Sequence, residues 1–212
     1  TLARRGCRVD AVELVPHNIE VFKANTEPGE QVAIYEGNAT DLSRFANDQY
    51  DITLLLGPMY HLFEAEDKRR ALSEAQRVTK PGGVLFVAYC CPDASIVQYG
   101  FMRGGLEKLF ASELLDPVTF KAVSRPEEIF ELHRKEEIDA LMQNFPELER
   151  LHYVASDLIA HYITPALAQW TDEQFDLFMR YHLTLCERPD MAGLTNHALD
   201  ILRKTNRKES RR

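Results

Sequence analysis

The chain has 212 residues, of which 25 are Lys or Arg, 33 are Asp or Glu, and 45% are apolar. This composition is typical of a globular protein with one domain of ordinary size, so it excludes a chain that is disordered throughout. No apolar run approaches the ~20 residues that a membrane-spanning helix requires. The net charge of −8 argues against general nucleic-acid binding, because most of the surface would repel phosphates.

The C-terminal tail, the cysteines and the first residues indicate the cellular compartment. Six of the last ten residues are basic and one is acidic, which predicts a solvated basic tail over residues 205–212, although such a tail can also contact RNA or lipid headgroups. The four cysteines, at positions 7, 90, 91 and 186, lack Cys-x-x-Cys spacing and so indicate neither a disulfide framework nor a zinc knuckle. No secretory signal opens the chain, and we expect a cytoplasmic protein.

The first residues read as the end of a helix. Thr1–Gly6 carries two arginines followed by a glycine that can adopt the left-handed cap conformation. Since a helix also needs a beginning, we expect the front of this domain to precede Thr1.

Strands and helices are then predicted to alternate. The expected strands are 7–14, 31–35, 50–56 and 84–89, and the expected helices are 16–26, 42–45 and 64–79. The run Tyr50–Leu56 is apolar on both faces, which is typical of a buried strand in a parallel sheet. Alternation with short connections predicts a doubly wound α/β fold for residues 1–91.

Residues 92–146 interrupt this alternation. The spacing Ser124-x-x-Glu127 is that of a helix capping box, and residues 134–144 predict a further helix. About fifty residues are too many for a simple connection, so we expect a helical cap or lid inserted here. Residues 147–204 are expected to return to the core with a strand at 148–155, helices through Trp170 and over 171–187, and a final strand near 197–203.

Ligands of open α/β sheets bind beyond the carboxyl ends of the strands, which directs attention to four segments. They are Val9-Asp10-Ala11-Val12-Glu13, Gly37-Asn38-Ala39-Thr40-Asp41-Leu42, Leu55-Leu56-Gly57-Pro58-Met59-Tyr60-His61-Leu62 and Lys80-Pro81-Gly82-Gly83. An acid at the position of Glu13 can bind both hydroxyls of a ribose. Together, over about Thr1–Tyr89, the series resembles the class I S-adenosylmethionine-dependent methyltransferases. Two later segments, 186–190 and 196–199, are similar to the C-terminal part of bacterial members that act on small molecules.

The resemblance implies a Rossmann-like sheet of seven strands, mostly parallel with an antiparallel last strand, and a helical cap between strands 5 and 6. It also implies that Glu13, with Leu14 beside it, binds the cofactor ribose, and that Asn38 and Ala39 meet the adenine. The family usually has Asp where this chain has Asn38, but the amide carbonyl still offers an acceptor. Gly57 matches the residue whose backbone approaches the methionine moiety.

One family element has no counterpart in the chain. The Gly-rich loop after the first strand is absent, since none of the ten glycines forms a G-x-G. The first strand is central in this family, and a sheet without it would expose backbone and apolar edges. If the natural protein began at Thr1, cofactor binding would be in doubt.

Several residues are candidates for the chemistry of methyl transfer. Tyr60 and His61 follow the strand toward which the methyl group should point, so His61 is a candidate base and Tyr60 a candidate cofactor contact. The alternative is that His61 caps a helix or fills the floor of the site. Cys90 and Cys91 fit either buried small residues or thiolates for a soft metalloid substrate.

Two further pairs have a structural alternative. His133 and Glu137 stand four residues apart, which allows a metal pair or a surface contact, and we predict no metal site. Arg188 and Asp190 fit a substrate contact or an ion pair equally well.

The sequence therefore predicts a methyltransferase that uses S-adenosylmethionine on a small-molecule acceptor, without nucleic-acid or membrane partners. Two alternatives stay open. One is a non-enzymatic interaction protein with a disabled site, and the other is a nicotinamide-dependent oxidoreductase on a similar sheet. The latter would need a Gly-rich fingerprint and a catalytic Tyr-Lys or His arrangement, and neither is found in the sequence.

Overall fold

The computed structural model describes residues 1–205, which fold as an α/β structure with six strands in two sheets. The smaller sheet is a parallel pair, and the larger has the order β3-β4-β6-β5. Strands β3, β4 and β5 run in one direction and β6 runs against them, which confirms the Rossmann-like α/β class with an antiparallel last strand. The strands are β1 (Val9–Glu13), β2 (Val32–Glu36), β3 (Tyr50–Leu55), β4 (Thr79–Cys90), β5 (Leu148–Ala155) and β6 (His197–Lys204).

Seven α-helices lie in the described residues: α1 (Pro16–Ala24), α2 (Ala65–Val78), α3 (Pro92–Ser95), α4 (Leu106–Ala111), α5 (Lys135–Met142), α6 (Thr164–Leu167) and α7 (Asp172–Leu185). Short helical turns occur at η1 (Ala3–Arg5), η2 (Pro58–Tyr60) and η4 (Pro189–Leu194), and η3 (Ile96–Met102) is a π-helix. Gly6 ends η1 with φ +87°, in the expected left-handed cap. None of the helices in residues 1–205 is both long and apolar enough to cross a membrane.

Three local expectations were wrong. Residues 42–45 form turns rather than a helix, and no helix follows Ser124. The Ser124 hydroxyl instead accepts a hydrogen bond from the Leu132 amide at 2.9 Å, so it caps an irregular segment. Residues 80–83, expected to separate the helix from the next strand, belong to β4 itself. The strand begins at Thr79, which already pairs with Tyr50 of β3.

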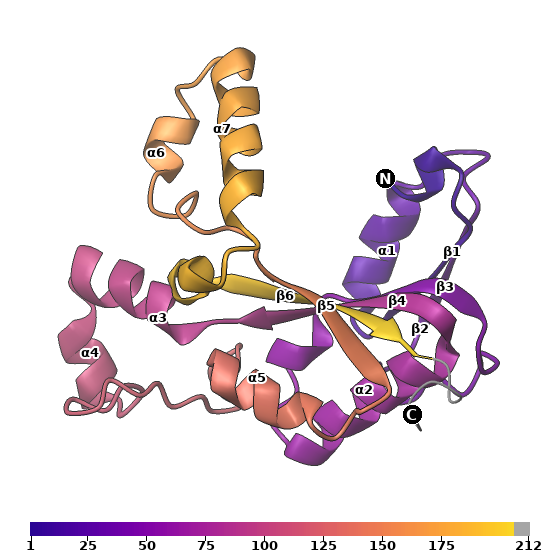
Figure 1. The fold of residues 1–212 in the computed structure, drawn as a ribbon, viewed down its shortest axis with the longest axis horizontal. Helices are drawn as coiled ribbons and strands as arrows, with labels where there is room; N and C mark the ends of the chain where they lie inside the picture. Colours follow the sequence, from indigo (N-terminus) through magenta and orange to yellow (C-terminus); the bar gives the residue numbers. More distant parts are fainter. Residues whose placement is uncertain (206–212) are drawn as a thin grey trace.

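The main core lies between the larger sheet and helices α2 and α5, which share one side of it (Figure 1). Helix α2 turns Ala71, Leu72 and Ala75 inward at helical spacing, and all three are buried. Leu85 and Val87 of β4 face them. This packing fixes the position of the loop that follows β3, because Met59 in that loop is fully buried in the same core.

The opposite face of β3 is exposed, contrary to the expectation of a strand buried on both sides. Ile52, Leu54 and Leu56 are 54%, 45% and 47% exposed, while Leu55 between them is buried. Side chains alternate along a strand, and α2 covers only the face that carries Leu55. Strand β3 is also an edge of its sheet, since it pairs with β4 alone within residues 1–205.

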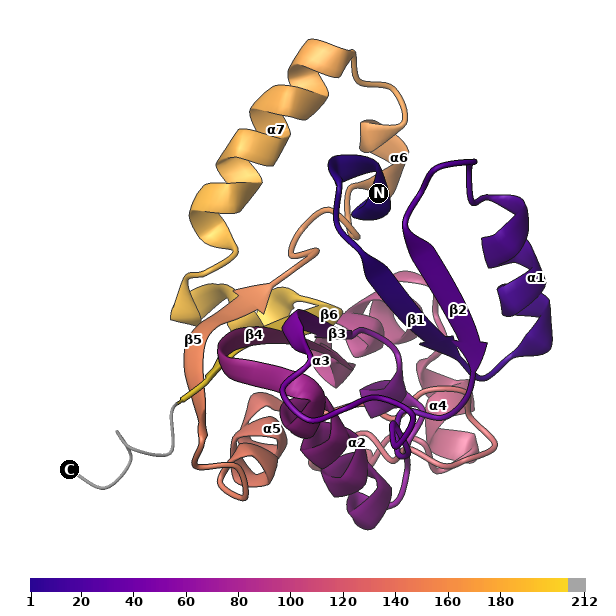
Figure 2. The same cartoon turned by 90° about the vertical axis from the view of Figure 1, so that its right-hand side faces the viewer.

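Side chains join the two sheets in place of a strand-to-strand ladder. Figure 2 shows β1 and β2 as a pair beside the larger sheet. The Tyr50 hydroxyl, at the start of β3, donates to Asp10 near the start of β1 at 2.9 Å. Phe45 packs edge-on against both Tyr35 and Tyr50. Strands β1 and β3 therefore begin on the same side, and their carboxyl ends lead to the same edge of the molecule.

Helices α3, α4 and α5 and the π-helix η3 lie between β4 and β5, in the segment predicted to form a lid. Phe101 and Met102 in this segment are 59% and 62% exposed, and Phe110 packs edge-on against Phe120. The predicted division into residues 1–91, 92–146 and 147–204 stays a prediction. The predicted basic tail lies almost wholly outside the described residues.

Candidate functional site

Glu13 and Leu14 stand where β1 ends. One carboxylate oxygen of Glu13, Oε1, accepts hydrogen bonds from the Val15 amide at 2.9 Å and from the Asn18 side chain at 3.3 Å. Within residues 1–205, Oε2 has no hydrogen-bond partner, and Leu14 is 60% exposed. The carboxylate is thus oriented by its own loop and still offers lone pairs to a ligand.

Asn38 and Ala39 stand at the end of the neighbouring strand β2. The Gly37 amide donates to the Glu13 carbonyl at 3.1 Å, which brings the ends of β1 and β2 together. A Cβ on Gly37 would lie 3.1 Å from Val12, so this close approach favours glycine. The Asn38 side-chain oxygen accepts from the Thr40 amide at 3.0 Å, an Asx turn that leaves the NH2 group free to face outward.

Gly57 follows β3 and opens toward free space. A Cβ placed on it would meet no atom within 4 Å, and its φ of −145° is accessible to other residues. Neither packing within the described chain nor backbone strain therefore requires a glycine here. An unhindered backbone is what the close approach of a ligand would need.

Tyr60 and His61 come directly after Gly57. The Tyr60 hydroxyl donates to the Leu56 carbonyl at 2.6 Å, and burial raises the pKa of Tyr60 above its ordinary value, with the nearby Cys90 thiol adding to the effect. His61 is exposed, and its Nδ1 lies 3.0 Å from the Ile129 carbonyl, which can only accept. Tyr60 is therefore a neutral hydroxyl, and His61 carries its proton on Nδ1.

Residues 129–133 run across this loop and hold it from outside. The rings of Tyr60, His61 and Phe130 contact one another with centroids 4.9 to 5.8 Å apart. The Glu131 amide donates to the Tyr60 carbonyl at 2.9 Å, and Lys68 of α2 binds the Glu131 carboxylate at 2.6 Å. The segment 129–133, which we call the strap, thus connects the inserted helices to the end of β3.

His133 ends the strap as a buried group, so the surface contact with Glu137 that the sequence allowed beside a metal pair is wrong for this ring. Its Nε2 lies 3.2 Å from the Met59 carbonyl, and burial lowers the pKa of His133. Glu137 instead accepts from the Arg134 amide. No cluster of three metal-ligating side chains occurs within residues 1–205.

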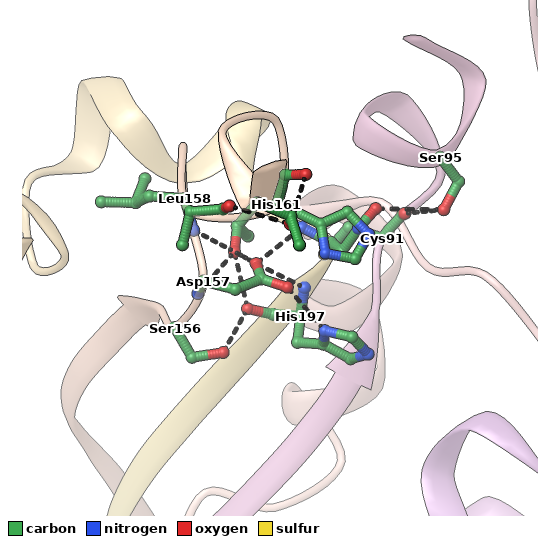
Figure 3. A network of polar contacts seen from close by, with 11 residues as sticks. Cys91, Ser95, Ser156, Asp157, Leu158, His161 and His197 are labelled. Carbon is green, nitrogen blue, oxygen red and sulfur yellow. Dashed lines mark hydrogen bonds and ion pairs between the residues drawn. The ribbon is translucent and has the colours of Figure 1, made fainter. Parts of the chain in front are cut away.

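A second polar centre, which the sequence did not predict, joins the end of β5 to the start of β6 (Figure 3). Asp157 accepts from His197 Nδ1 at 2.7 Å, from the Asn196 amide at 2.9 Å, and from the Thr195 hydroxyl. His197 pairs with Cys90 at the end of β4. Asp157 and His197 are 40 residues apart, so no local spacing could have revealed the pair.

The remaining candidates are structural in their contacts. Cys90 and Cys91 are buried, and burial raises the pKa of Cys91 to about 12, which rules out a reactive thiolate there at neutral pH. All four cysteines are free. Arg188 and Asp190 form an exposed ion pair with a shortest distance of 2.5 Å.

Residues 1–87 match the family model of the methyltransferase domain. A SAM-dependent methyltransferase from Methanosarcina mazei shares the fold with a TM-score of 0.59 at 16% identity, over 96% of this chain and 85% of that one. A SAM-dependent methyltransferase from Thermotoga maritima gives a TM-score of 0.53 at 17% identity, over 92% and 72%. The N-methyltransferase NodS from Bradyrhizobium japonicum, solved with S-adenosyl-L-homocysteine, gives 0.51 at 12% identity, over 94% and 67%.

No curated protein sequence matches the chain. The solved structures, all below 25% identity, establish a shared fold. Residues 1–87 are thus similar in sequence to the methyltransferase domain, and the described chain has the fold of S-adenosylmethionine-dependent methyltransferases.

Proposed function

We propose that the protein transfers the methyl group of S-adenosylmethionine to a small-molecule acceptor at the carboxyl ends of β1, β2, β3 and β4. The observation that carries this proposal is the order of ligand-ready groups along that edge. Glu13, Asn38 and Gly57 follow three strands in turn, and Tyr60 comes next, beside Cys90. Each of these groups has a free lone pair, a free donor or an open backbone.

The residues present fit the cofactor. Glu13 would bind the ribose hydroxyls through Oε2, which has no partner within residues 1–205, and through the remaining lone pair of Oε1. Leu14 would cover the adenosine with apolar surface, and Asn38 and Ala39 would meet the adenine. The free space at Gly57 would admit the methionine part to the backbone. S-adenosylmethionine, when bound, supplies a methyl group on a sulfonium that is already an activated leaving group.

The chain's own task is then alignment and exclusion of water. Tyr60 keeps its proton, because burial raises its pKa and its hydroxyl is committed to the Leu56 carbonyl. It can orient an acceptor through its oxygen lone pairs but cannot remove a proton. His61 directs its Nδ1 proton to the Ile129 carbonyl of the strap, which leaves Nε2 as the ring nitrogen that could contact the acceptor.

The inserted segment would cover the acceptor. Its exposed apolar side chains, Phe101 and Met102 among them, are suited to shielding a small organic molecule from water. Nucleic acid is disfavoured as an acceptor by the net charge of −8, and cytoplasm remains the predicted location.

Calorimetric titration with S-adenosylhomocysteine tests the proposed cofactor contacts, using the protein expressed with its native N-terminus. Glu13→Gln should weaken binding roughly 10- to 100-fold, since hydrogen bonds to a charged group contribute about 1.5–3 kcal/mol. Glu20→Gln, an exposed acid on the following helix, is the matched control and should bind as the parent does. Equal affinity in all three proteins would remove Glu13 from the site.

Gly57→Ala separates a ligand role from a structural one. Because a Cβ at this position meets nothing within 4 Å, the variant should fold normally. If the cofactor approaches this backbone, its affinity should nevertheless fall. Unchanged affinity would place the cofactor elsewhere.

A further inference from the structure

We propose that His197, positioned by Asp157, binds a carboxylate of the methyl acceptor. This inference rests on the proposed function, because it requires the acceptor to reach the carboxyl edge of the sheet near β4. It adds the chemical class of the acceptor and the residue that selects it.

Both carboxylate oxygens of Asp157 are held by hydrogen bonds. Oδ1 accepts from the amides of Asn196 and His197 at 2.9 and 3.2 Å and from the Thr195 hydroxyl, while Oδ2 accepts from the His197 ring. Burial would raise the pKa of Asp157, but hydrogen bonds from His197 and Thr195 lower it to about 2. Asp157 is therefore a fixed, ionised carboxylate whose position and charge set those of the ring.

His197 carries a positive charge and is partly exposed. The hydrogen bond to Asp157, with the nearby Cys90 side chain adding to its effect, raises the pKa of His197 to about 10, so the ring is an imidazolium at neutral pH. Half of the side chain is exposed, although Nδ1 is occupied. Figure 3 shows one ring nitrogen turned to Asp157 and the other edge of the ring turned away from it. His197 thus offers a charged N–H donor and cannot act as a base at neutral pH.

His197 lies at the edge of the sheet where β4 ends. His197 pairs with Cys90, the last residue of β4. Cys90 also lies near enough to Tyr60 to help raise the pKa of that hydroxyl. The imidazolium therefore stands on the same edge as the residues proposed to receive the cofactor and the acceptor. A structural ion pair needs no such place, as His152 and Glu187 show: at 3.0 Å they join the middle of β5 to the loop after α7, away from the strand end.

The local charges select a monoanion. Besides Asp157 and Cys90, the groups near the pair are Tyr162, which interacts with Asp157, and Asp93 of α3. Asp157 and Asp93 would repel a phosphate dianion about twice as strongly as a carboxylate monoanion, so the single imidazolium favours the ligand of lower charge. The aromatic rings of Tyr60 and Phe130 along this edge are suited to a flat acceptor.

Benzoate and its uncharged isostere benzamide are direct probes. The Hε1 resonance of the His197 ring is followed by NMR at pH 7.5 during titration, with and without S-adenosylhomocysteine. We expect a saturable shift with benzoate and none with benzamide. In calorimetric titrations, which do not depend on the His197 resonance, His197→Gln should lose at least tenfold in benzoate affinity. His152→Gln, which removes the other half-exposed histidine–acid pair, should bind benzoate as the parent does.

Asp157→Asn tests the positioning role through pH. The ring pKa should return from about 10 toward its ordinary ~6.5, so benzoate affinity should fall across pH 6–8 in this variant but not in the parent. Failure to bind benzoate, equal shifts with benzamide, unchanged affinity in His197→Gln, or the same pH profile in Asp157→Asn would each overturn the proposal. Because S-adenosylhomocysteine binding is measured separately, its failure would count against the proposed function instead.

Discussion

Substitution of Arg150 on β5 tests what keeps β5 and β6 in register. These two strands lead to Asp157 and His197. Its guanidinium binds both oxygens of Asp200 on β6 at 2.6 and 2.9 Å and reaches Asp139 of α5 at 2.6 Å. Asp200 is fully buried, and burial raises its pKa even with Arg150 beside it. Arg150→Met would leave that carboxyl without its cation.

The expected cost follows from these contacts. Removing one partner of a buried pair typically costs about 3–5 kcal/mol, and we expect the lower end because 28% of the Arg150 side chain is exposed. In a domain of this size, a loss of about 3 kcal/mol lowers the unfolding midpoint by roughly 6–12 °C. The Asp200 pKa should rise further, so the folded variant binds a proton that the unfolded chain releases. Its stability should therefore fall as pH rises through that pKa, and the deficit should be smallest in acid.

Thermal and urea unfolding at pH 5 and pH 8 measure these effects. Arg188→Met, which breaks an exposed ion pair, is the control and should cost about 1 kcal/mol or less. Adding Asp200→Asn to Arg150→Met should restore much of the loss, since it removes the unpaired buried charge. The reasoning is refuted if Arg150→Met costs no more than Arg188→Met, or if its deficit is the same at both pH values.

Two further predictions concern the strap and the loop after β3. Tyr60→Phe removes the hydroxyl bonded to the Leu56 carbonyl and should lower the unfolding free energy by about 0.5–1.5 kcal/mol in urea titrations. Lys68→Met leaves the largely buried Glu131 carboxylate without its cation, so hydrogen exchange in the strap should accelerate, whereas Arg69→Met on the exposed side of α2 should not change it.

The elements with strong local signals were predicted to within about two residues. Helix α2 has apolar side chains at helical spacing, and helix α7 begins with a capping box in which Thr171 and Gln174 exchange hydrogen bonds. Ser124-x-x-Glu127 is a motif of the same capping-box type but opens no helix, because the residues that follow it bury no apolar face. Local chemistry therefore located helices only where tertiary packing agreed with it.

The candidate site, too, was only partly predictable from local sequence. Glu13, Asn38, Gly57 and Tyr60 were found because strand ends can be read from the sequence, and their roles stay predictions. Asp157 and His197 could not be found this way, since they meet only through the antiparallel pairing of β5 and β6. His197 was noticed only as part of a family-like segment, and the structure supplies its partner.

The most direct test of the account is thermal unfolding with S-adenosylhomocysteine or with a reduced nicotinamide dinucleotide, on the protein with its native N-terminus. A ligand that binds only the folded state adds roughly 2.7 kcal/mol at a hundred times its dissociation constant. We predict a raised midpoint with S-adenosylhomocysteine, a smaller rise in Glu13→Gln, and none with the nicotinamide compound. A folded protein whose midpoint S-adenosylhomocysteine leaves unchanged would contradict the account.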